Sequence, residues 1–343
     1  MQPQTPAISV LIPTYNYGRF LPQAIESVLR QDFGDFELII SDDCSPDNTA
    51  EILAHYASRD PRVRVQIHPR NLGMVPNWNW CIHQARGKYI KYLFGDDTFA
   101  HPSALSRLKN LLDENPGASL GASARLTLDE SSNATGVWND VGPTGLIPGA
   151  KIAAECFLRS LNLPGEPSTV IFRREQALRA FDPTLRQIVD LEMWLHLLMQ
   201  GDFAYTSEPL CCFRIHGQQQ TAVNRQNQVG VLEMTALLDR YLPLLTKHSD
   251  EPLDPSTKAA ILYRALHHLR KKNSGQPPFS TAIRHIESQL SFASRTFSAL
   301  GYRVRRPLEN ARRALRQRAL RAQLQTGLRE QIAFLATLPR TAS

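Results

Sequence analysis

The chain has 343 residues, of which 42% are hydrophobic and 8% aromatic, the proportions of a soluble globular protein with one large domain and an appendage, or with two domains. No apolar run approaches the roughly 18 residues of a membrane-spanning helix, so no such helix is expected. No basic segment followed by an apolar core opens the chain, so no signal peptide is expected. The five cysteines lack Cys-x-x-Cys spacing, which argues against a disulfide scaffold or a structural zinc site and favours a reducing cytoplasm.

The formal charge of +7 is concentrated at the end of the chain. From Gly301 onward there are ten Arg, no Lys and two Glu, a net charge of +8, so the preceding residues are together close to neutral. This basic tail fits a solvated helix packed on the body, or a helix lying in the plane of an anionic membrane surface. Binding to nucleic-acid phosphates is a third interpretation, but the tail lacks interleaved aromatic residues and any recognisable binding motif. We therefore expect no nucleic-acid partner.

The first hundred residues alternate between strands and helices with short connections. Apolar runs of strand length alternate with segments in which apolar residues recur at helical spacing. This pattern is typical of an α/β fold with a largely parallel sheet that is covered on both faces. The expected strands are 8–14, 36–41, 63–68 and 89–94, and the expected helices are 20–29, 49–58 and 77–85.

The remainder of the chain divides into a mixed part and a helical part. The mixed part is expected to contain helices at 103–114, 151–161 and 191–199, strands at 120–128, 168–172, 203–206 and 210–215, and a long loop at 129–149. Past residue 221 only helical patterns occur, at 229–245, 255–272, 279–300 and 307–338. We expect a domain boundary near residue 225, with an α/β domain at 1–225 and a helical C-terminal region with the basic tail at 226–343.

Two of the expected strands end in a pair of carboxylates. Asp42 and Asp43 follow the second strand, and Asp96 and Asp97 follow the fourth strand after a break at Gly95. In open α/β sheets, ligands bind just beyond the carboxyl ends of the strands. Paired oxygen ligands at such a position suit Mg²⁺ or Mn²⁺ holding a phosphate group, whereas the alternative is a solvated acidic turn. The coincidence of two such strand ends favours a crevice for a nucleotide and a metal.

Several segments, in this order and spacing, resemble the family 2 glycosyltransferases. They lie between Ile8 and Thr221, about two thirds of the chain, and they are residues 9–16, 36–45, 78–81 with 87–90, 95–97, 190–194 and 214–216. The resemblance implies a GT-A fold, which is Rossmann-like with a mostly parallel central sheet flanked by helices. It also implies a nucleotide-sugar donor, usually a divalent metal, and inversion of configuration at the sugar carbon.

The resemblance assigns five residues to the nucleoside. Pro13 and Tyr15 resemble the wall of the base pocket. Asp43 resembles the aspartate that hydrogen-bonds the base, commonly uracil, and a carboxylate can accept a hydrogen bond from a uracil-type N–H group. Asn71 and Gly73 resemble the loop that lines the nucleoside pocket. The alternatives are that Asp43 only caps a turn and that the loop is an ordinary turn.

Asp96 and Asp97 resemble the metal-binding pair of the family. Adjacent residues in extended chain point in opposite directions, so we assign Asp97 to the metal and Asp96 to the ribose or the nearby backbone. His216, in an Arg-x-His segment, resembles a histidine that closes over the diphosphate. An imidazole ligand suits Mn²⁺ better than Mg²⁺, so the expected cofactor is Mn²⁺ or Mg²⁺. The alternative for His216 is an ordinary polar loop residue.

Asp190 resembles the catalytic base, four residues before Trp194. A carboxylate can accept the proton that the acceptor hydroxyl loses as it attacks the anomeric carbon. The alternative is that Asp190 caps the following helix. The family often has an acidic residue directly before this aspartate, whereas this chain has Val189, so the tuning of the Asp190 pKa is expected to differ. Glu192 is expected either to support the site or to lie on the helix surface.

The sequence thus predicts a cytoplasmic, inverting glycosyltransferase of polysaccharide biosynthesis at the cell envelope. The expected donor is a UDP-sugar, and the expected acceptor is a hydroxyl of a saccharide or a lipid-linked saccharide. Contact with the inner face of the membrane is expected through the basic tail. One alternative is a nucleotidyltransferase, but that class usually shows a Gly-rich basic phosphate loop near its first strand, and residues 15–19 are not one. The other alternative is a non-catalytic binding or scaffold protein that uses the tail.

Overall fold

The structure, a computed structural model, describes residues 5–217, 219, 229–247, 253–272, 277–303, 307, 311, 314–315 and 328–340. The strands are β1 Ile8–Thr14, β2 Phe36–Asp42, β3 Val63–Ile67, β4 Tyr89–Tyr92, β5 Thr98–Phe99, β6 Ala118–Leu128, β7 Ala134–Trp138, β8 Gly145–Ile147, β9 Val170–Arg173 and β10 Asp202–Arg214. The helices are α1 Leu21–Leu29, α2 Thr49–Arg59, α3 Met74–Gln84, α4 Ala104–Asp113, α5 Gly149–Arg159, α6 Val189–Leu198, α8 Val229–Lys247, α9 Pro255–Lys272, α10 Phe279–Ser288 and α12 Arg329–Thr337, with 3-10 turns η1 Pro167–Thr169 and η2 Arg174–Ala177.

A single mixed sheet organises the fold, with strand order β3-β2-β1-β4-β9-β6-β10-β5 and with β7 and β8 paired to β6 and β10. β1 to β4 run parallel to one another, and β9 lies antiparallel between β4 and β6. β10 runs parallel to β6. The carboxyl ends of β1, β2, β4, β6 and β10 therefore face the same edge of the sheet. The expected α/β fold with a helical C-terminal region is confirmed, and parallel pairing dominates in the first four strands.

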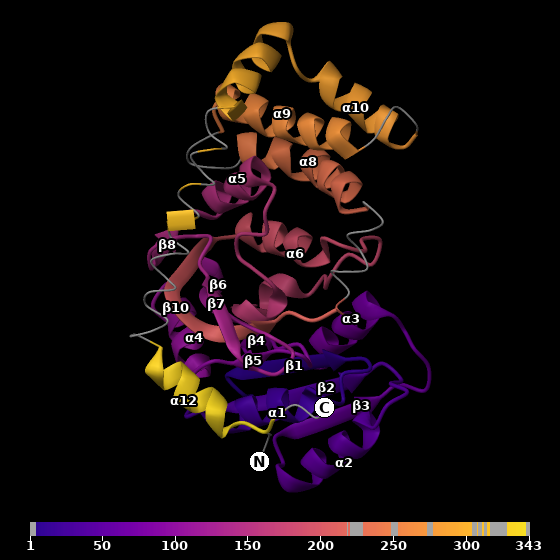
Figure 1. Cartoon of the computed structure of the whole chain (residues 1–343), viewed down its shortest axis with the longest axis vertical. Helices are drawn as coiled ribbons and strands as arrows, with labels where there is room; N and C mark the ends of the chain where they lie inside the picture. Colours follow the sequence, from indigo (N-terminus) through magenta and orange to yellow (C-terminus); the bar gives the residue numbers. More distant parts are fainter. Residues whose placement is uncertain are drawn as a thin grey trace.

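Strands β1, β2 and β4 are buried along their whole length because both faces of the sheet are covered there. Alternate side chains of β1 enter different clusters: Val10 and Ile12 pack with α1, α2 and α4, whereas Leu11 packs with α3 on the other face. Helices α5, α6, α8 and α9 contribute to the same cluster as α3. Figure 1 shows α6 between the sheet and the helices α8 to α10, which form one end of the molecule.

The long loop expected between Asp129 and Gly149 was a wrong prediction. This segment contains β7, which pairs antiparallel with β6, and β8, which pairs antiparallel with β10. Both strands are short and rich in Gly, Thr and exposed positions, so they lack the apolar alternation by which strands are recognised. Their pairing partners, rather than their own sequence, determine their conformation.

Two further elements differ from expectation. The strands expected at 203–206 and 210–215 form one long strand, β10, whose register shifts around Pro209. A bulge accommodates this proline because proline cannot donate a ladder hydrogen bond. Helix α6 was expected to be amphipathic, but it is buried on nearly all sides because α8 covers the face turned away from the sheet.

The C-terminal part of the chain packs on both faces of the α/β domain. The expected boundary at residue 225 lies outside the described residues. So does most of the basic tail, including Arg305, Arg306 and Arg312. Helices α8 and α9 join the cluster on the α6 face, whereas Phe334 and Leu338 at the end of the chain join the cluster on the α1 face. Within the described ranges, no helix has both the length and the apolar character needed to cross a membrane.

Helix α12 is expected to contribute to stability although it lies far from the sheet in sequence. Phe334 is 8% exposed, and Arg30 donates a hydrogen bond to the carbonyl of Thr337 at 2.7 Å. Phe334→Ala should lower the free energy of unfolding by about 3 kcal/mol because it removes a buried aromatic ring and leaves a cavity. Phe297→Ala is the matched control, since Phe297 is 76% exposed. Urea denaturation measures both variants, and equal stabilities would contradict the docking of α12.

Candidate active site

The site lies where the chain changes direction across the sheet. β2 and β3 extend from one side of β1, whereas β4 returns to its other side, so the carboxyl ends of β1 and β4 border a topological switch point. Gly95 follows β4 at this point, and a Cβ atom there would lie 2.8 Å from the hydroxyl oxygen of Thr14. A residue without a side chain is therefore required for Asp96 and Asp97 to approach the end of β1 this closely.

The two carboxylates after β4 face different surroundings. Asp96 Oδ2 lies 3.0 Å from His216 Nε2, and the half-buried Tyr17 ring packs edge-on against His216 at 5.7 Å. Asp97 accepts a hydrogen bond from the backbone N–H of Arg214 at 2.9 Å through Oδ1, while its Oδ2 is buried without a hydrogen-bond partner among the described residues. Burial, and then the charge of Asp96, raise the pKa of Asp97 well above its ordinary value.

Asp96 and Asp97 contact different groups at the end of β10: Asp97 accepts from the backbone N–H of Arg214, and Asp96 contacts the ring of His216. The assignment of Asp97 to the metal and of Asp96 to the ribose stays a prediction. However, His216 contacts Asp96 and not Asp97, so the histidine is on the side that was assigned to the ribose. The predicted pair of Asp97 and His216 is therefore not joined directly, and Asp96 links them.

Arg214 is fully buried and joins the elements around the site. Its Nε donates to the carbonyl of Asp96 at 2.7 Å, and its Nη1 donates to the carbonyl of Asp129 at 2.9 Å. Its Nη2 donates to the side chain of Gln23 on α1, and the guanidinium lies 4.7 Å from the centre of the Phe20 ring. One side chain thus connects β10 with the segment after β4, the turn after β6 and helix α1.

The residues predicted to bind the nucleoside gather at the ends of β1 and β2. The carboxylate of Asp43 is 2% exposed and accepts hydrogen bonds from the backbone N–H groups of Leu72, at 2.6 Å, and Gly73, at 2.9 Å. Asn71 donates through its side chain to the carbonyl of Asp43 at 3.2 Å. Gly73 has φ of 93°, a conformation that favours glycine. Asp43 therefore shapes the 71–73 loop, and a carboxylate retains lone pairs for one further donor.

The other residues of this region have distinct roles. Pro13 is buried within β1, whereas Tyr15 follows it with 47% of its surface exposed and can therefore face a ligand. Asp42 accepts hydrogen bonds from both the backbone N–H and the hydroxyl of Ser45, so Asp42 rather than Asp43 caps the turn after β2. The contacts of Asp42, the first member of the pair, are therefore local.

Asp190 lies in the first turn of α6 and is partly exposed. Its Oδ2 accepts a hydrogen bond from the side chain of Asn162 at 2.8 Å, and its Oδ1 accepts one from the backbone N–H of Leu191 at 2.8 Å. The surrounding burial raises its pKa to about 7, and the negative charge of Glu166 acts in the same direction. A carboxyl group with this pKa can both accept and release a proton near neutral pH.

Glu166 connects the two acidic parts of the site. Its negative charge acts on both Asp97 and Asp190 and raises the pKa of each. Arg125 of β6 forms an ion pair with Glu166, with 2.6 Å between Nε and Oε2. Glu166 directly precedes η1, which starts the antiparallel strand β9 at the same sheet edge as the ends of β4 and β6.

The sequence analysis did not identify Gln23, Asn162, Glu166 and Arg214 as site residues. Each makes its contact across more than 25 positions of chain, so no local motif marks them. Of these four residues, only Arg214 is part of a recognisable sequence motif, because it precedes His216 in the Arg-x-His segment. Trp194, four residues after Asp190, is a core residue: it is fully buried and donates from Nε1 to the carbonyl of Gly165 at 2.9 Å.

The carboxylate oxygens after β4 fit a divalent cation that takes most of its ligands from bound substrate and water and few from the protein. Among the described residues, no group of three or more His, Cys, Asp and Glu side chains is arranged to hold a metal by itself. The Oδ2 of Asp97 is a buried carboxyl oxygen that has no hydrogen-bond partner among the described residues. Mg²⁺ and similar ions commonly use one or two carboxylates and complete their shell with substrate phosphates and water.

Comparison with solved structures identifies the class of fold. The structure of S. aureus TarS residues 1–349 in complex with UDP-GlcNAc aligns with a TM-score of 0.61 at 17% sequence identity, covering 81% of this chain and 79% of that one. The structure of the same TarS segment without a named ligand aligns with a TM-score of 0.60 at 16% identity and covers 98% of this chain. The mixed sheet with its C-terminal helices is thus a GT-A glycosyltransferase fold.

Sequence comparison identifies the family. A family profile described as Glycosyl transferase family 2 matches residues 9–158. The putative teichuronic acid biosynthesis glycosyltransferase TuaG of Bacillus subtilis is 30% identical over 207 residues, 58% of this chain and 75% of that protein. An uncharacterized Mycobacterium tuberculosis protein, MT1568, is also 30% identical, over 77% of this chain and 82% of its own. The chain belongs to glycosyltransferase family 2, and this decides against the nucleotidyltransferase and scaffold alternatives.

Arg214 should be the least replaceable residue of the site. Arg214→Gln leaves Asp96, Asp97 and the Asp129 carbonyl without their shared cation, and loss of one buried partner should lower the free energy of unfolding by roughly 3–5 kcal/mol. Arg214→Lys should also be unstable, because an ammonium group cannot reproduce the fork of guanidinium donors. Arg59→Gln, at an exposed position of α2, should change stability by less than about 0.5 kcal/mol. A loss below about 1 kcal/mol for Arg214→Gln in urea denaturation would contradict the central role of this residue.

Proposed function

We propose that this glycosyltransferase moves a sugar from a nucleotide diphosphate donor, a UDP-sugar, to a hydroxyl group of a saccharide or a lipid-linked saccharide. The observation that carries the proposal is the Asp190 carboxylate, which is partly exposed, held by Asn162 and has its pKa raised to about 7. It shares the neighbour Glu166 with Asp97, on the phosphate side of the site. A base and an anion-binding region on two sides of one crevice suit transfer between a donor and an acceptor.

The proposed reaction is a single displacement with inversion. The acceptor oxygen forms a bond to the anomeric carbon while the bond from that carbon to the diphosphate oxygen breaks. Asp190 takes the proton of the acceptor hydroxyl, and the hydrogen bond from Asn162 Nδ2 keeps one carboxylate oxygen oriented while the proton is transferred. The electron pair of the broken bond leaves with the nucleoside diphosphate. We assign Pro13, Tyr15, Asp43, Asn71 and Gly73 to the nucleoside, as their common position at the ends of β1 and β2 supports.

We further propose that Mn²⁺ or Mg²⁺ binds at the end of β4. Asp97 Oδ2 is the group best suited to ligate it, with Asp96 and His216 on the adjacent side. When bound, a divalent cation neutralises the negative charge that develops on the departing diphosphate. Asp97 itself is fixed by the backbone N–H of Arg214, so its free oxygen is directed without a change of rotamer.

The relatives support a role in polysaccharide biosynthesis at the cell envelope. TuaG carries the name of a teichuronic acid biosynthesis glycosyltransferase, and TarS has been solved with UDP-GlcNAc and with UDP. A uracil nucleotide agrees with the carboxylate of Asp43 at the base position, because the N3–H group of uracil is a donor. The UDP-linked donor and the envelope saccharide acceptor proposed for this chain rest on these similarities together with the site.

Asp190→Asn tests the assignment of the base. The amide keeps the shape of the side chain but cannot take a proton, so UDP release from a UDP-sugar should fall by roughly 100-fold to 10,000-fold. Binding of UDP should be unchanged, because the nucleoside residues belong to β1, β2 and the 71–73 loop. In the wild type, activity should be lost as the pH falls through about 7, since protonation of Asp190 removes the base. Unchanged turnover in Asp190→Asn, or a rate that is flat between pH 5 and 8, would overturn the assignment.

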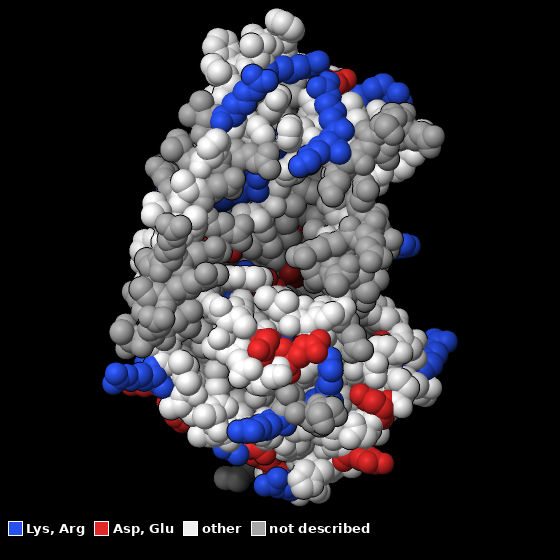
Figure 2. Space-filling model, viewed as in Figure 1, with Lys and Arg blue, Asp and Glu red and all other residues white. Residues whose placement is uncertain are grey.

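We also propose that the C-terminal region touches an anionic membrane surface. The helix at residues 292–303 turns Phe292, Phe297 and Leu300 to the outside, with 86%, 76% and 63% of their surfaces exposed. Phe292, Leu300 and the exposed Arg303 lie on one side of the helix, and Phe297 lies beside Leu300, three residues before it. Figure 2 shows basic side chains gathered over this helical end on the face in view, and acidic ones nearer the sheet. Apolar anchors beside a basic segment favour the surface of an anionic bilayer.

Sedimentation with anionic vesicles at low salt tests this membrane contact. Replacing Phe292, Phe297 and Leu300 by Ser should reduce binding by roughly tenfold or more, because three side chains lose their apolar burial in the bilayer. Leu178→Ser is the control for an exposed leucine elsewhere, since Leu178 is 61% exposed. A wild-type protein that stays in the supernatant would end the proposal. So would binding that survives the triple replacement.

A further inference from the structure

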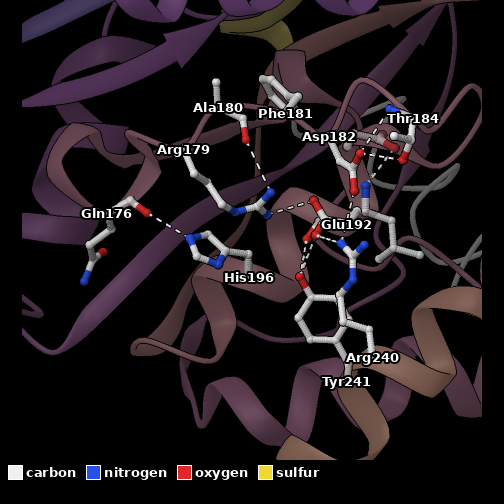
Figure 3. Close-up of polar contacts among 12 residues, drawn as sticks. Gln176, Arg179, Ala180, Phe181, Asp182, Thr184, Glu192, His196, Arg240 and Tyr241 are labelled. Atoms are coloured by element: carbon white, nitrogen blue, oxygen red, sulfur yellow. Dashed lines mark hydrogen bonds and ion pairs between the residues drawn. The ribbon is translucent and has the colours of Figure 1, made fainter.

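Glu192 is a buried acid on the first turn of α6, two residues after Asp190. Its side chain is 1% exposed. Its Oε2 accepts a hydrogen bond from Arg179 at 2.7 Å, and its Oε1 accepts hydrogen bonds from Arg240 at 2.8 Å and from the Tyr241 hydroxyl at 2.7 Å. Figure 3 shows the carboxylate of Glu192 between Arg179 on one side and the two α8 residues on the other. Of the two alternatives for Glu192 in the sequence analysis, surface exposure is therefore excluded.

Helix α8 makes a second attachment, on the other side of Asp190. The carboxylate of Glu233 accepts hydrogen bonds from the backbone N–H groups of Arg186, at 2.6 Å, Gln187, at 3.0 Å, and Ile188, at 3.0 Å. These residues lead directly into α6. One acidic side chain therefore satisfies three adjacent N–H groups at the entrance of the helix that carries the proposed base.

The two attachments belong to one face of α8. Glu233 and Arg240 are seven residues apart, about two helical turns, so they point in nearly the same direction. In the sequence, Asp190 lies between residues 186–188, which Glu233 contacts, and Glu192, which Arg240 contacts. Arg240 also reaches Asp182 at 3.2 Å, which extends the contact to the loop before α6. Helix α8 thus holds the segment that carries Asp190 at both ends.

The contact between α6 and α8 around Glu192 contains more charged groups than are needed to pack two helices together. A buried carboxylate costs free energy unless it is paired and hydrogen-bonded, and apolar packing of similar volume is often at least as stable. Here one carboxylate is paired with two guanidinium groups and a hydroxyl. Such directional contacts fix the position of a helix more narrowly than apolar contacts do, and the helix they fix carries the proposed base.

We propose that Glu192, Arg240 and Tyr241 form a positioning cluster through which α8 sets the direction of the Asp190 carboxylate towards the acceptor. This inference rests on the proposed role of Asp190 as base. None of the three side chains touches the groups assigned to the nucleotide. Their loss should therefore slow the proton-transfer step and leave binding of the donor as it was. The C-terminal region is then a working part of the catalytic site and not an appendage.

The test compares graded variants, with UDP release from UDP-N-acetylglucosamine as the assay. Tyr241→Phe removes one hydrogen bond and keeps the ring, and should lower kcat roughly tenfold, because small displacements of a catalytic group have large effects on rate. Arg240→Gln should lower kcat by roughly 100-fold, and Arg240→Lys should recover part of that loss because it keeps the charge. KM for the donor should remain within about twofold of wild type in all three. Tyr205→Phe is the matched control, since its hydroxyl bonds Asn139 at 3.0 Å, away from α6.

The outcomes separate this inference from the proposed function. If Asp190→Asn is inactive but Tyr241→Phe keeps the kcat of Tyr205→Phe, the base stands and the positioning cluster is refuted. A rise in donor KM with unchanged kcat would also refute it, because the cluster would then act on binding. If Asp190→Asn retains its rate, the base assignment fails whatever the cluster variants do. If Arg240→Gln does not fold, the kcat of Tyr241→Phe relative to that of Tyr205→Phe decides whether the positioning cluster exists.

Discussion

The site depends on one buried cation. The guanidinium of Arg214 has no access to water, so each of its donors needs a protein partner, and the partners come from the segments after β4 and β6 and from helix α1. Its backbone N–H also orients Asp97. The two adjacent aspartates would repel each other in a buried place without a nearby positive charge. Arg214 therefore allows two acidic residues to remain at the switch point of the sheet, the position that we propose for the metal and the diphosphate.

The sheet supplies the geometry that makes this possible. The carboxyl ends of β1, β2, β4, β6 and β10 meet at one edge, so residues separated by more than a hundred positions become neighbours. The residues that we assign to the nucleoside gather around β1 and β2, and α6 carries the proposed base Asp190. Helix α8 then secures α6 from the side opposite the sheet. In this arrangement the GT-A core and the C-terminal helices share one hydrophobic cluster, and their functions are joined by the polar contacts around Glu192.

Much of the fold and several residues of the candidate site could be predicted from the sequence. The elements and residues that could not be predicted were missed for physical reasons. The sequences of β1, β2 and β4 are largely apolar and stop at Pro13, Asp42 and Gly95, so their positions and the residues that follow them are marked locally. β7 and β8 were missed because they have little apolar pattern of their own and exist through their pairing. Gln23, Asn162 and Glu166 were missed because their contacts join distant parts of the chain. The roles of Asp190 and Asp97 remain predictions that chemistry has to test.

The most direct test of this account is calorimetric titration of the wild-type protein and Asp97→Asn with UDP, with and without Mn²⁺. The account predicts that UDP binds tightly to the wild type only with the metal, and that Asp97→Asn loses at least about tenfold in affinity, because a carboxylate ligand to the cation is gone. Equal affinity with and without metal in both proteins would contradict the assignment of Asp97. Stronger binding of ADP than of UDP would contradict the proposed donor.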